Sequence, residues 1–225
     1  MKKMRLDKYL ANSLYDIGRA RIKKEIKKGE VAVNGKIIKD PSYKVQNEEI
    51  LYKGKKVEYK KFRYFILYKP KGYITATKGS EPFALELINH PFADKLFPAG
   101  RLDKDVEGLV IFTNDGQFAH NIMSPKHHLE KEYEIEYNGE ITQEKIEAVE
   151  NGLKLEEYIA RPGKMFLKDG KIHLIISEGK YHQVKEMMKT LNIEIINMKR
   201  IRIGKISCEN LKEGEWREVE KDEIL

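Results

Sequence analysis

Apolar positions near the start of the chain recur at helical spacing. A helix is predicted over residues 5–16, and its apolar face consists of Leu6, Tyr9, Leu10 and Leu14. A second helix is predicted over residues 19–28, because Ile22 and Ile26 lie on one side of it and Gly29 ends it. The opposite side carries the lysines Lys23, Lys24, Lys27 and Lys28.

The helices are followed by a β-hairpin pattern. Val31 and Val33 alternate with small or polar residues, and Asn34-Gly35 is a preferred two-residue turn. A polar stretch, Tyr52 to Lys61, predicts a linker that closes the first domain. We therefore expect two domains, residues 1–60 and residues 61–225.

Strand patterns dominate the rest of the chain. Tyr64 to Tyr68 is one apolar run, and residues 131–137 alternate between apolar residues and glutamates. A further strand is predicted around Ile172, Leu174 and Ile176. Residues 182–191 predict a helix whose apolar face consists of Val184, Met187, Met188 and Leu191.

Composition narrows the class of protein. Of 225 residues, 40% are hydrophobic, which suffices for a packed core. The net charge of +7 favours a polyanionic partner such as nucleic acid, although ordinary surface lysines remain an equal alternative. The single cysteine, Cys208, rules out an intrachain disulfide and a multi-cysteine metal site. With no membrane-length apolar run and no secretory signal, we expect a cytoplasmic monomer.

The stretch from Gly100 to Gly116 contains the strongest candidate for chemistry. An acid-rich loop with Arg101 and Asp103 comes directly before an apolar run, and a carboxylate held beside a strand is a candidate nucleophile. A calcium loop counted from Asp103 would end at Asn114, where a bidentate Glu is required, so that alternative is disfavoured.

Other cofactor patterns are missing from the sequence. His127 and His128 are adjacent and would point apart on a strand, so a structural or RNA-contact role is favoured over a metal site. Neither a phosphate-binding loop nor a dinucleotide fingerprint occurs. We therefore expect no metal, nucleotide or other cofactor.

The first domain resembles a small RNA-binding module, the S4-like domain of a ribosomal protein and of bacterial tyrosyl-tRNA synthetases. The motifs are RLDKYLAN and RARIKKEIKKGEVAVNGK, within residues 4–50. One departure is Gly18, where the family usually has Ser, which puts the side-chain cap of the second helix in doubt. The resemblance implies RNA contacts by Arg5, Lys8, Arg19, Lys23, Lys24 and Lys27.

The second domain resembles the pseudouridine synthases, specifically the RsuA branch that modifies 16S ribosomal RNA. Its ordered blocks are KPKGYI (69–74), GRLDKDVEGLVIFTNDG (100–116), HHLEKEYEI (127–135), EGKYHQVKEMM (178–188), MKRIRIG (198–204) and EGEWREV (213–219). The resemblance implies an α+β fold, in which a small S4-like α/β module precedes a mixed, largely antiparallel sheet with flanking helices.

The resemblance also assigns roles. It implies Asp103 as nucleophile, Tyr133 as the ring that packs on uracil, and Lys185 as the cation that favours the ionised carboxylate. From spacing alone, Tyr133 suits a core position better, and Arg101 suits a structural partner of Asp103 or Glu107 slightly better. Further candidate RNA contacts are Arg101, Lys69, Lys71, Lys131, His182 and Gln183.

The expected partner is 16S ribosomal RNA or a small-subunit assembly intermediate, with no membrane involved. The YHQVK wording at residues 181–185 favours the small-subunit branch over sister branches that modify 23S ribosomal RNA. A non-catalytic RNA-binding assembly factor is the other alternative.

Overall fold

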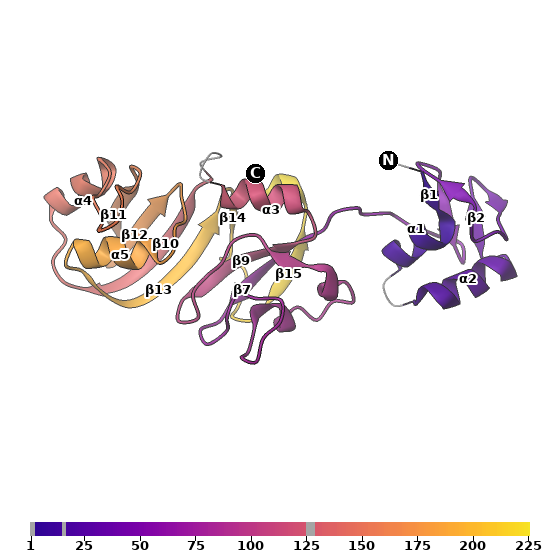
Figure 1. The fold of residues 1–225 in the computed structure, drawn as a ribbon, viewed down its shortest axis with the longest axis horizontal. Helices are drawn as coiled ribbons and strands as arrows, with labels where there is room; N and C mark the ends of the chain where they lie inside the picture. Colours follow the sequence, from indigo (N-terminus) through magenta and orange to yellow (C-terminus); the bar gives the residue numbers. More distant parts are fainter. Residues whose placement is uncertain (1–2, 15–16, 125–128) are drawn as a thin grey trace. The chain divides into compact units, whose positions relative to one another are not determined.

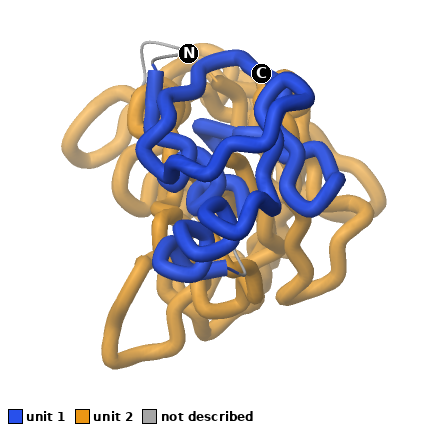
Figure 2. The backbone as a smooth tube through the Cα atoms, turned by 90° about the vertical axis from the view of Figure 1, so that its right-hand side faces the viewer, with its two compact units in different colours: residues 1–62 blue, residues 63–225 orange. Residues whose placement is uncertain are grey.

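The computed structural model describes residues 3–14, 17–124 and 129–225 of the chain. The chain divides into two compact units, Met1–Phe62 and Arg63–Leu225, which Figure 2 colours separately. Each unit has a hydrophobic core of its own. Apolar burial therefore stabilises the two units independently.

Two helices form one layer of the N-terminal unit. The first, α1 (Leu6–Ser13), is shorter than predicted, and Tyr15 and Asp16 lie outside the described residues. The second, α2 (Arg19–Lys28), has the predicted bounds. No side chain caps its first turn at Gly18, whereas Gly29 adopts the left-handed conformation (φ 85°) that ends a helix.

The other layer is a small antiparallel sheet in the order β3-β2-β5-β6. Its strands are β2 (Val31–Val33), β3 (Lys36–Ile37), β5 (Ile50–Tyr52) and β6 (Lys55–Lys56), and β1 (Met4–Arg5) pairs separately with β4 (Lys44–Val45). The predicted hairpin at Asn34-Gly35 is confirmed, since both residues have positive φ (47° and 77°).

The predicted linker from Tyr52 to Lys61 is wrong over its first half. Lys53 and Gly54 have φ of 50° and 77°, so they form a second tight turn between β5 and β6. Val57, beyond this hairpin, is buried in the N-terminal core. The core consists of Leu6, Tyr9, Leu10, Ile22, Ile26, Val31, Val33, Val45, Ile50, Tyr52 and Val57.

A mixed sheet forms the centre of the second unit. Within the described residues it has nine strands, seven of them in the order β11-β12-β10-β13-β9-β7-β15, with β14 beside β13 and β8 beside β9. The strands are β7 (Tyr64–Lys69), β8 (Phe97–Pro98), β9 (Glu107–Thr113), β10 (Lys131–Asn138), β11 (Lys164–Lys168), β12 (Lys171–Ile176), β13 (Glu194–Ile203), β14 (Ile206–Ser207) and β15 (Trp216–Val219).

Helices flank this sheet. In Figure 1, α4 (Gln143–Glu150) and α5 (Gln183–Thr190) lie near β10 to β13, and α3 (Gly116–Met123) lies near β9. A short helix, α6 (Lys221–Ile224), follows β15, and two 3₁₀ turns cover Ala84–Leu87 and Ala93–Lys95. The predicted fold class is confirmed, as is the buried face of α5, which contains Val184, Met187 and Met188.

The two halves of the sheet meet where β9 and β13 run parallel, unlike every other strand pair of the described residues. Only two positions pair there, Glu107 with Lys199 and Gly108 with Arg200. Gly108 has φ of 113°, and a Cβ at this position would lie 2.3 Å from the Arg200 carbonyl oxygen. Glycine is therefore required for the two backbones to approach. We call this junction the parallel seam.

Candidate active site

The loop before β9 holds Asp103 beside the parallel seam. Thr75 is buried and fixes this loop, since its hydroxyl accepts from the Leu102 amide (3.0 Å) and donates to the Leu102 carbonyl (2.6 Å). On the other side of Asp103, the Lys104 carbonyl accepts from the Gly72 amide at 2.8 Å. The backbone that carries Asp103 is thus anchored on both sides.

Lys69 has a different place from the one predicted. The side chain is fully buried, and its ammonium donates to the carbonyls of Pro70 and Tyr73, each at 2.9 Å. Burial lowers the pKa of Lys69 to about 8. The predicted phosphate contact at Lys69 is wrong, because the side chain shapes the turn that supports the Asp103 loop. Lys71 remains exposed in that turn.

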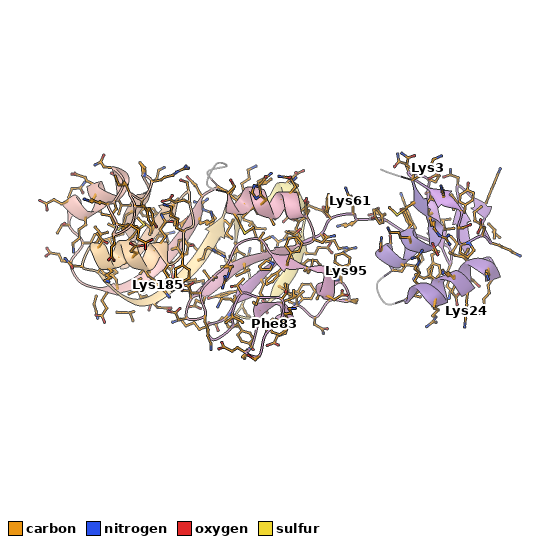
Figure 3. The ribbon with its side chains drawn as sticks, in the orientation of Figure 1. Lys3, Lys24, Lys61, Phe83, Lys95 and Lys185 are labelled. Carbon is orange, nitrogen blue, oxygen red and sulfur yellow. The ribbon has the colours of Figure 1, made fainter. Side chains whose placement is uncertain are left out.

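Lys185, which Figure 3 labels, belongs to the first turn of α5. Its ammonium contacts two carboxylates. Its Nζ lies 3.0 Å from Asp103 Oδ2 and 2.8 Å from Asp105 Oδ1. Burial alone would lower the pKa of Lys185, but hydrogen bonds to both carboxylates outweigh it and raise the pKa. The hydrogen bonds from Lys185 likewise lower the pKa of Asp105. The ammonium is thus held charged beside the candidate nucleophile.

A single cavity brings the three candidate catalytic side chains together. It has a volume of about 70 Å³, and Asp103, Tyr133 and Lys185 all line it. Tyr133 is only 7% exposed and comes from the inward face of β10. Apolar walls are supplied by Val106, Ile176, Val184 and Met198. An acid, a phenol and an ammonium from three distant segments therefore line one hollow whose wall is both polar and apolar.

A second, larger cavity of about 320 Å³ shares Arg101, Asp103 and Tyr133 with the first. Lys131 lines it rather than an outer surface, being only 8% exposed, with its ammonium donating to the Leu129 carbonyl at 3.2 Å. Burial, together with repulsion from Arg200, lowers the pKa of Lys131 to about 8. Lys131 therefore adds a buried cation to the wall of this cavity.

Arg200 is a residue that sequence reasoning missed. It is 3% exposed, lines the larger cavity, and donates to the carbonyls of Leu109 (2.9 Å) and Arg101 (3.2 Å). Its Nη2 has no hydrogen-bond partner within the part of the chain that the structure describes. No local pattern marks Arg200, because its place opposite Tyr133 in the middle of the sheet depends on strand pairing.

Arg101 is exposed at the mouth of both cavities. Among residues 3–14, 17–124 and 129–225, its guanidinium makes no ion pair with Asp103 or Glu107. Glu107 instead accepts from the Tyr68 hydroxyl and the Asn197 amide, both at 2.9 Å. The interpretation of Arg101 as a structural partner of these acids is therefore wrong.

His182 and Gln183 open α5 but play unequal parts. The His182 Nε2 lies 3.4 Å from Asp103 Oδ2, and this residue has the left-handed φ of 52°. Gln183 is 3% exposed, and its amide donates to Glu178 (2.6 Å) and accepts from the Lys180 backbone (3.0 Å). The amide of Gln183 is therefore used inside the protein, although the residue lines the cavity of Asp103, and the RNA contact at Gln183 stays a prediction.

Comparison with protein families assigns both units. Residues 63–190, more than half of the chain, match the family described as RNA pseudouridylate synthase. The chain belongs to this RNA pseudouridine synthase family. Residues 4–51 match the S4 domain. The synthase therefore isomerises uridine to pseudouridine in RNA, and it binds RNA through its S4 domain.

Relatives of the synthase match along nearly its whole length. It is 40% identical over 98% of the chain to an uncharacterized RNA pseudouridine synthase of Bacillus subtilis, 97% of which is covered. It is 38% identical to the ribosomal small subunit pseudouridine synthase A of Pasteurella multocida, with 98% of each chain covered. A crystal structure of a pseudouridylate synthase aligns with a TM-score of 0.68 at 36% identity, covering 98% of both chains.

In the S4 domain of the synthase, the predicted RNA-binding cations lie at the surface. Lys8, Lys24 and Lys27 are exposed. Sequence reasoning missed the buried Asp7, to which Arg5 (3.1 Å), Arg19 (3.0 Å) and Lys23 (3.9 Å) all turn. Desolvation would raise the pKa of Asp7, but the hydrogen bonds from the two arginines lower it. Asp7 therefore holds the two arginines in place as a pair.

His127 and His128 lie outside the described residues. None of the helices formed by the described residues has the length and apolarity that crossing a bilayer demands.

Proposed function

We propose that the chain is a small-subunit synthase of the RsuA branch, which isomerises one uridine of 16S ribosomal RNA. The observation that carries the chemistry is the single cavity lined by Asp103, Tyr133 and Lys185. The small-subunit assignment is supported by the Pasteurella relative, whose name specifies the small ribosomal subunit, and by the YHQVK wording at residues 181–185.

Asp103 is the nucleophile or the charge-stabilising carboxylate of this proposal. The bond between uracil N1 and ribose C1′ breaks, the base turns, and a bond from uracil C5 to C1′ forms. The proton on C5 is lost and the freed N1 takes one up, so the product is an isomer of the substrate. Because atoms and electrons balance, the chain needs no redox cofactor or phosphate donor. Lys185, whose Nζ lies 3.0 Å from Asp103 Oδ2, puts a positive charge beside the attacking carboxylate.

The target base must leave its stack to reach this cavity. Tyr133 provides a ring against which the flipped uracil packs, and its hydroxyl is the group placed to move a proton. Arg101, exposed at the mouth of the cavity, binds the extruded nucleotide or its phosphate. These roles give each side chain a contact with the substrate that only the flipped state makes.

Label release tests the proposal. Small-subunit RNA with tritium at uracil C5 should lose label when it is incubated with the protein, because C5 exchanges its proton for a bond to carbon. Release of label from 23S ribosomal RNA alone would assign the protein to a sister branch that modifies 23S ribosomal RNA. No release from either RNA by folded protein would contradict the catalytic proposal and leave the S4 domain as an RNA-binding factor.

Asp103→Asn separates chemistry from binding. The amide is no nucleophile, so label release should fall below detection while RNA affinity stays within a few fold. Asp169→Asn, in an exposed turn of the same unit, is the matched control and should keep full turnover. Turnover retained in Asp103→Asn would remove Asp103 from the mechanism.

A further inference from the structure

An aromatic residue next to the active site is almost fully in water. Tyr181 is 81% exposed, although it carries a large ring. The ring stacks on that of His182, with centroids 3.8 Å apart and planes inclined by 21°. An exposed ring with its face open gains little from protein packing, whereas bases of single-stranded RNA stack on such rings.

The stacked pair leads from the surface to Asp103. The His182 Nε2 lies 3.4 Å from Asp103 Oδ2, and Tyr181 lies one ring farther out. Both rings line the 320 Å³ cavity that Asp103 and Tyr133 also line. A base on Tyr181 would therefore sit about one nucleotide away from a uridine at Asp103.

The loop that carries Tyr181 is held from both ends. Glu178 is buried and accepts from the Arg161 amide (2.9 Å) and from Gln183 (2.6 Å). The ammonium of Lys180 lies 3.2 Å from the centroid of the Tyr158 ring. An aromatic ring on a braced loop binds a base at a low cost in conformational entropy.

The charges around Tyr181 indicate from which side RNA arrives. The 320 Å³ cavity has the cations Arg101, Lys131 and Arg200 in its wall. The hollow on the other side of Tyr181 is mixed in charge, because Glu156, Glu157 and Glu186 line it together with lysines. A phosphate backbone is attracted to the first side, which also contains Asp103.

We propose that Tyr181 and His182 form a stacking subsite for the base of the nucleotide next to the target uridine. The subsite rests on the proposed pseudouridine synthase function and extends it, because it makes the neighbouring nucleotide part of recognition. It selects for an unpaired neighbour rather than for one particular base, since every base has a face that can stack.

The test pairs a protein change with an RNA change. Tyr181→Ala should weaken binding of a single-stranded fragment centred on the mapped uridine on the order of tenfold, whereas Tyr181→Phe and Tyr181→Trp should stay within about twofold of wild type. Replacing one neighbouring nucleotide by an abasic residue should weaken wild type and leave Tyr181→Ala unaffected. Ile159→Ala, at a residue 68% exposed in the same unit, is the control.

Affinity is measured in the Asp103→Asn background, so that the subsite is tested without turnover. If Tyr181→Ala binds as wild type does, or if its loss persists on the abasic RNA at both neighbours, the subsite is overturned. Label release by the wild-type protein is followed separately. A failure of the proposed catalytic function therefore shows there, and a failure of the subsite shows only in the affinities.

Discussion

The two units of the synthase differ in where their candidate functional cations lie. In the S4 domain, cations such as Lys8, Lys24 and Lys27 lie exposed in solvent. In the catalytic unit, Lys69, Lys131 and Arg200 are buried, and Lys185 forms ion pairs with two carboxylates. Exposed lysines bind any phosphate backbone, whereas buried cations act at fixed points and are costly to bury.

This difference suggests a division of labour. The S4 domain should set how tightly the synthase holds RNA, and the interior cations should set what happens to the uridine in the cavity. Each unit can be altered without the other, because their cores are separate. Three changes test whether RNA affinity depends on the S4 domain and turnover on the catalytic unit.

The largest effect is expected at Lys185. Lys185→Met leaves Asp103 and Asp105 without their shared counter-charge, so kcat should fall on the order of 100-fold or more while RNA affinity changes little. Lys185→Arg retains a cation and should recover much of the loss. Single-turnover label release measures both variants. An affinity loss as large as the kcat loss would break the comparison.

An intermediate effect is expected in the S4 domain. Replacing Lys23, Lys24 and Lys27 by Gln removes three exposed charges from α2, and RNA affinity should fall about tenfold at moderate salt. A plot of log Kd against log salt should become shallower by up to about two. Saturating kcat should stay unchanged. The control is Lys168→Gln, an exposed lysine of the catalytic unit.

The smallest effect concerns stability and pH. The pKa of Lys131 is about 8 in the folded chain, against an ordinary value of 10.5. Between pH 8 and pH 10.5, the unfolded chain therefore keeps a proton on Lys131 that the folded chain has lost. The free energy of unfolding should therefore rise as pH increases from about 8 to 10.5. Lys131→Met should show a shallower rise, with Lys69 contributing the remainder.

Urea unfolding at several pH values measures this rise. Trp216, the single tryptophan, lies on β15 and reports the catalytic unit by fluorescence. Lys71→Met, at an exposed lysine, should follow wild type. If the free energy of unfolding rose equally with pH in Lys131→Met and in wild type, the pKa of Lys131 would not be lowered by burial.

Local patterns in the sequence predicted the elements that depend on neighbouring residues. The bounds of α2, the Asn34-Gly35 hairpin and the apolar face of α5 all follow from spacing within about ten residues. The hairpin at Lys53-Gly54 escaped notice, because Lys is not a typical residue for a position with positive φ. The polar character of that stretch suggested a linker instead.

Features that depend on distant segments could not be predicted. Nothing in the local sequence around Thr75 indicates that it braces Leu102, which lies 27 residues away. The same holds for Arg200, which reaches the loop of Arg101 only because β13 pairs with β9. The resemblance to a family supplied Asp103, Tyr133 and Lys185 as candidates, and the structure shows them around one cavity.

The parallel seam has a consequence for biosynthesis. Gly108 and Arg200 touch across about ninety intervening residues, and β7 gains its outer neighbour only when Trp216 to Val219 pair with it. A nascent chain on the ribosome can complete its S4 domain early, because that unit ends at Phe62. Its catalytic hollow cannot close until Arg200 and the strand Trp216–Val219 have been synthesised. During synthesis, a partial chain can therefore bind RNA through its S4 domain before its catalytic unit is able to isomerise a uridine.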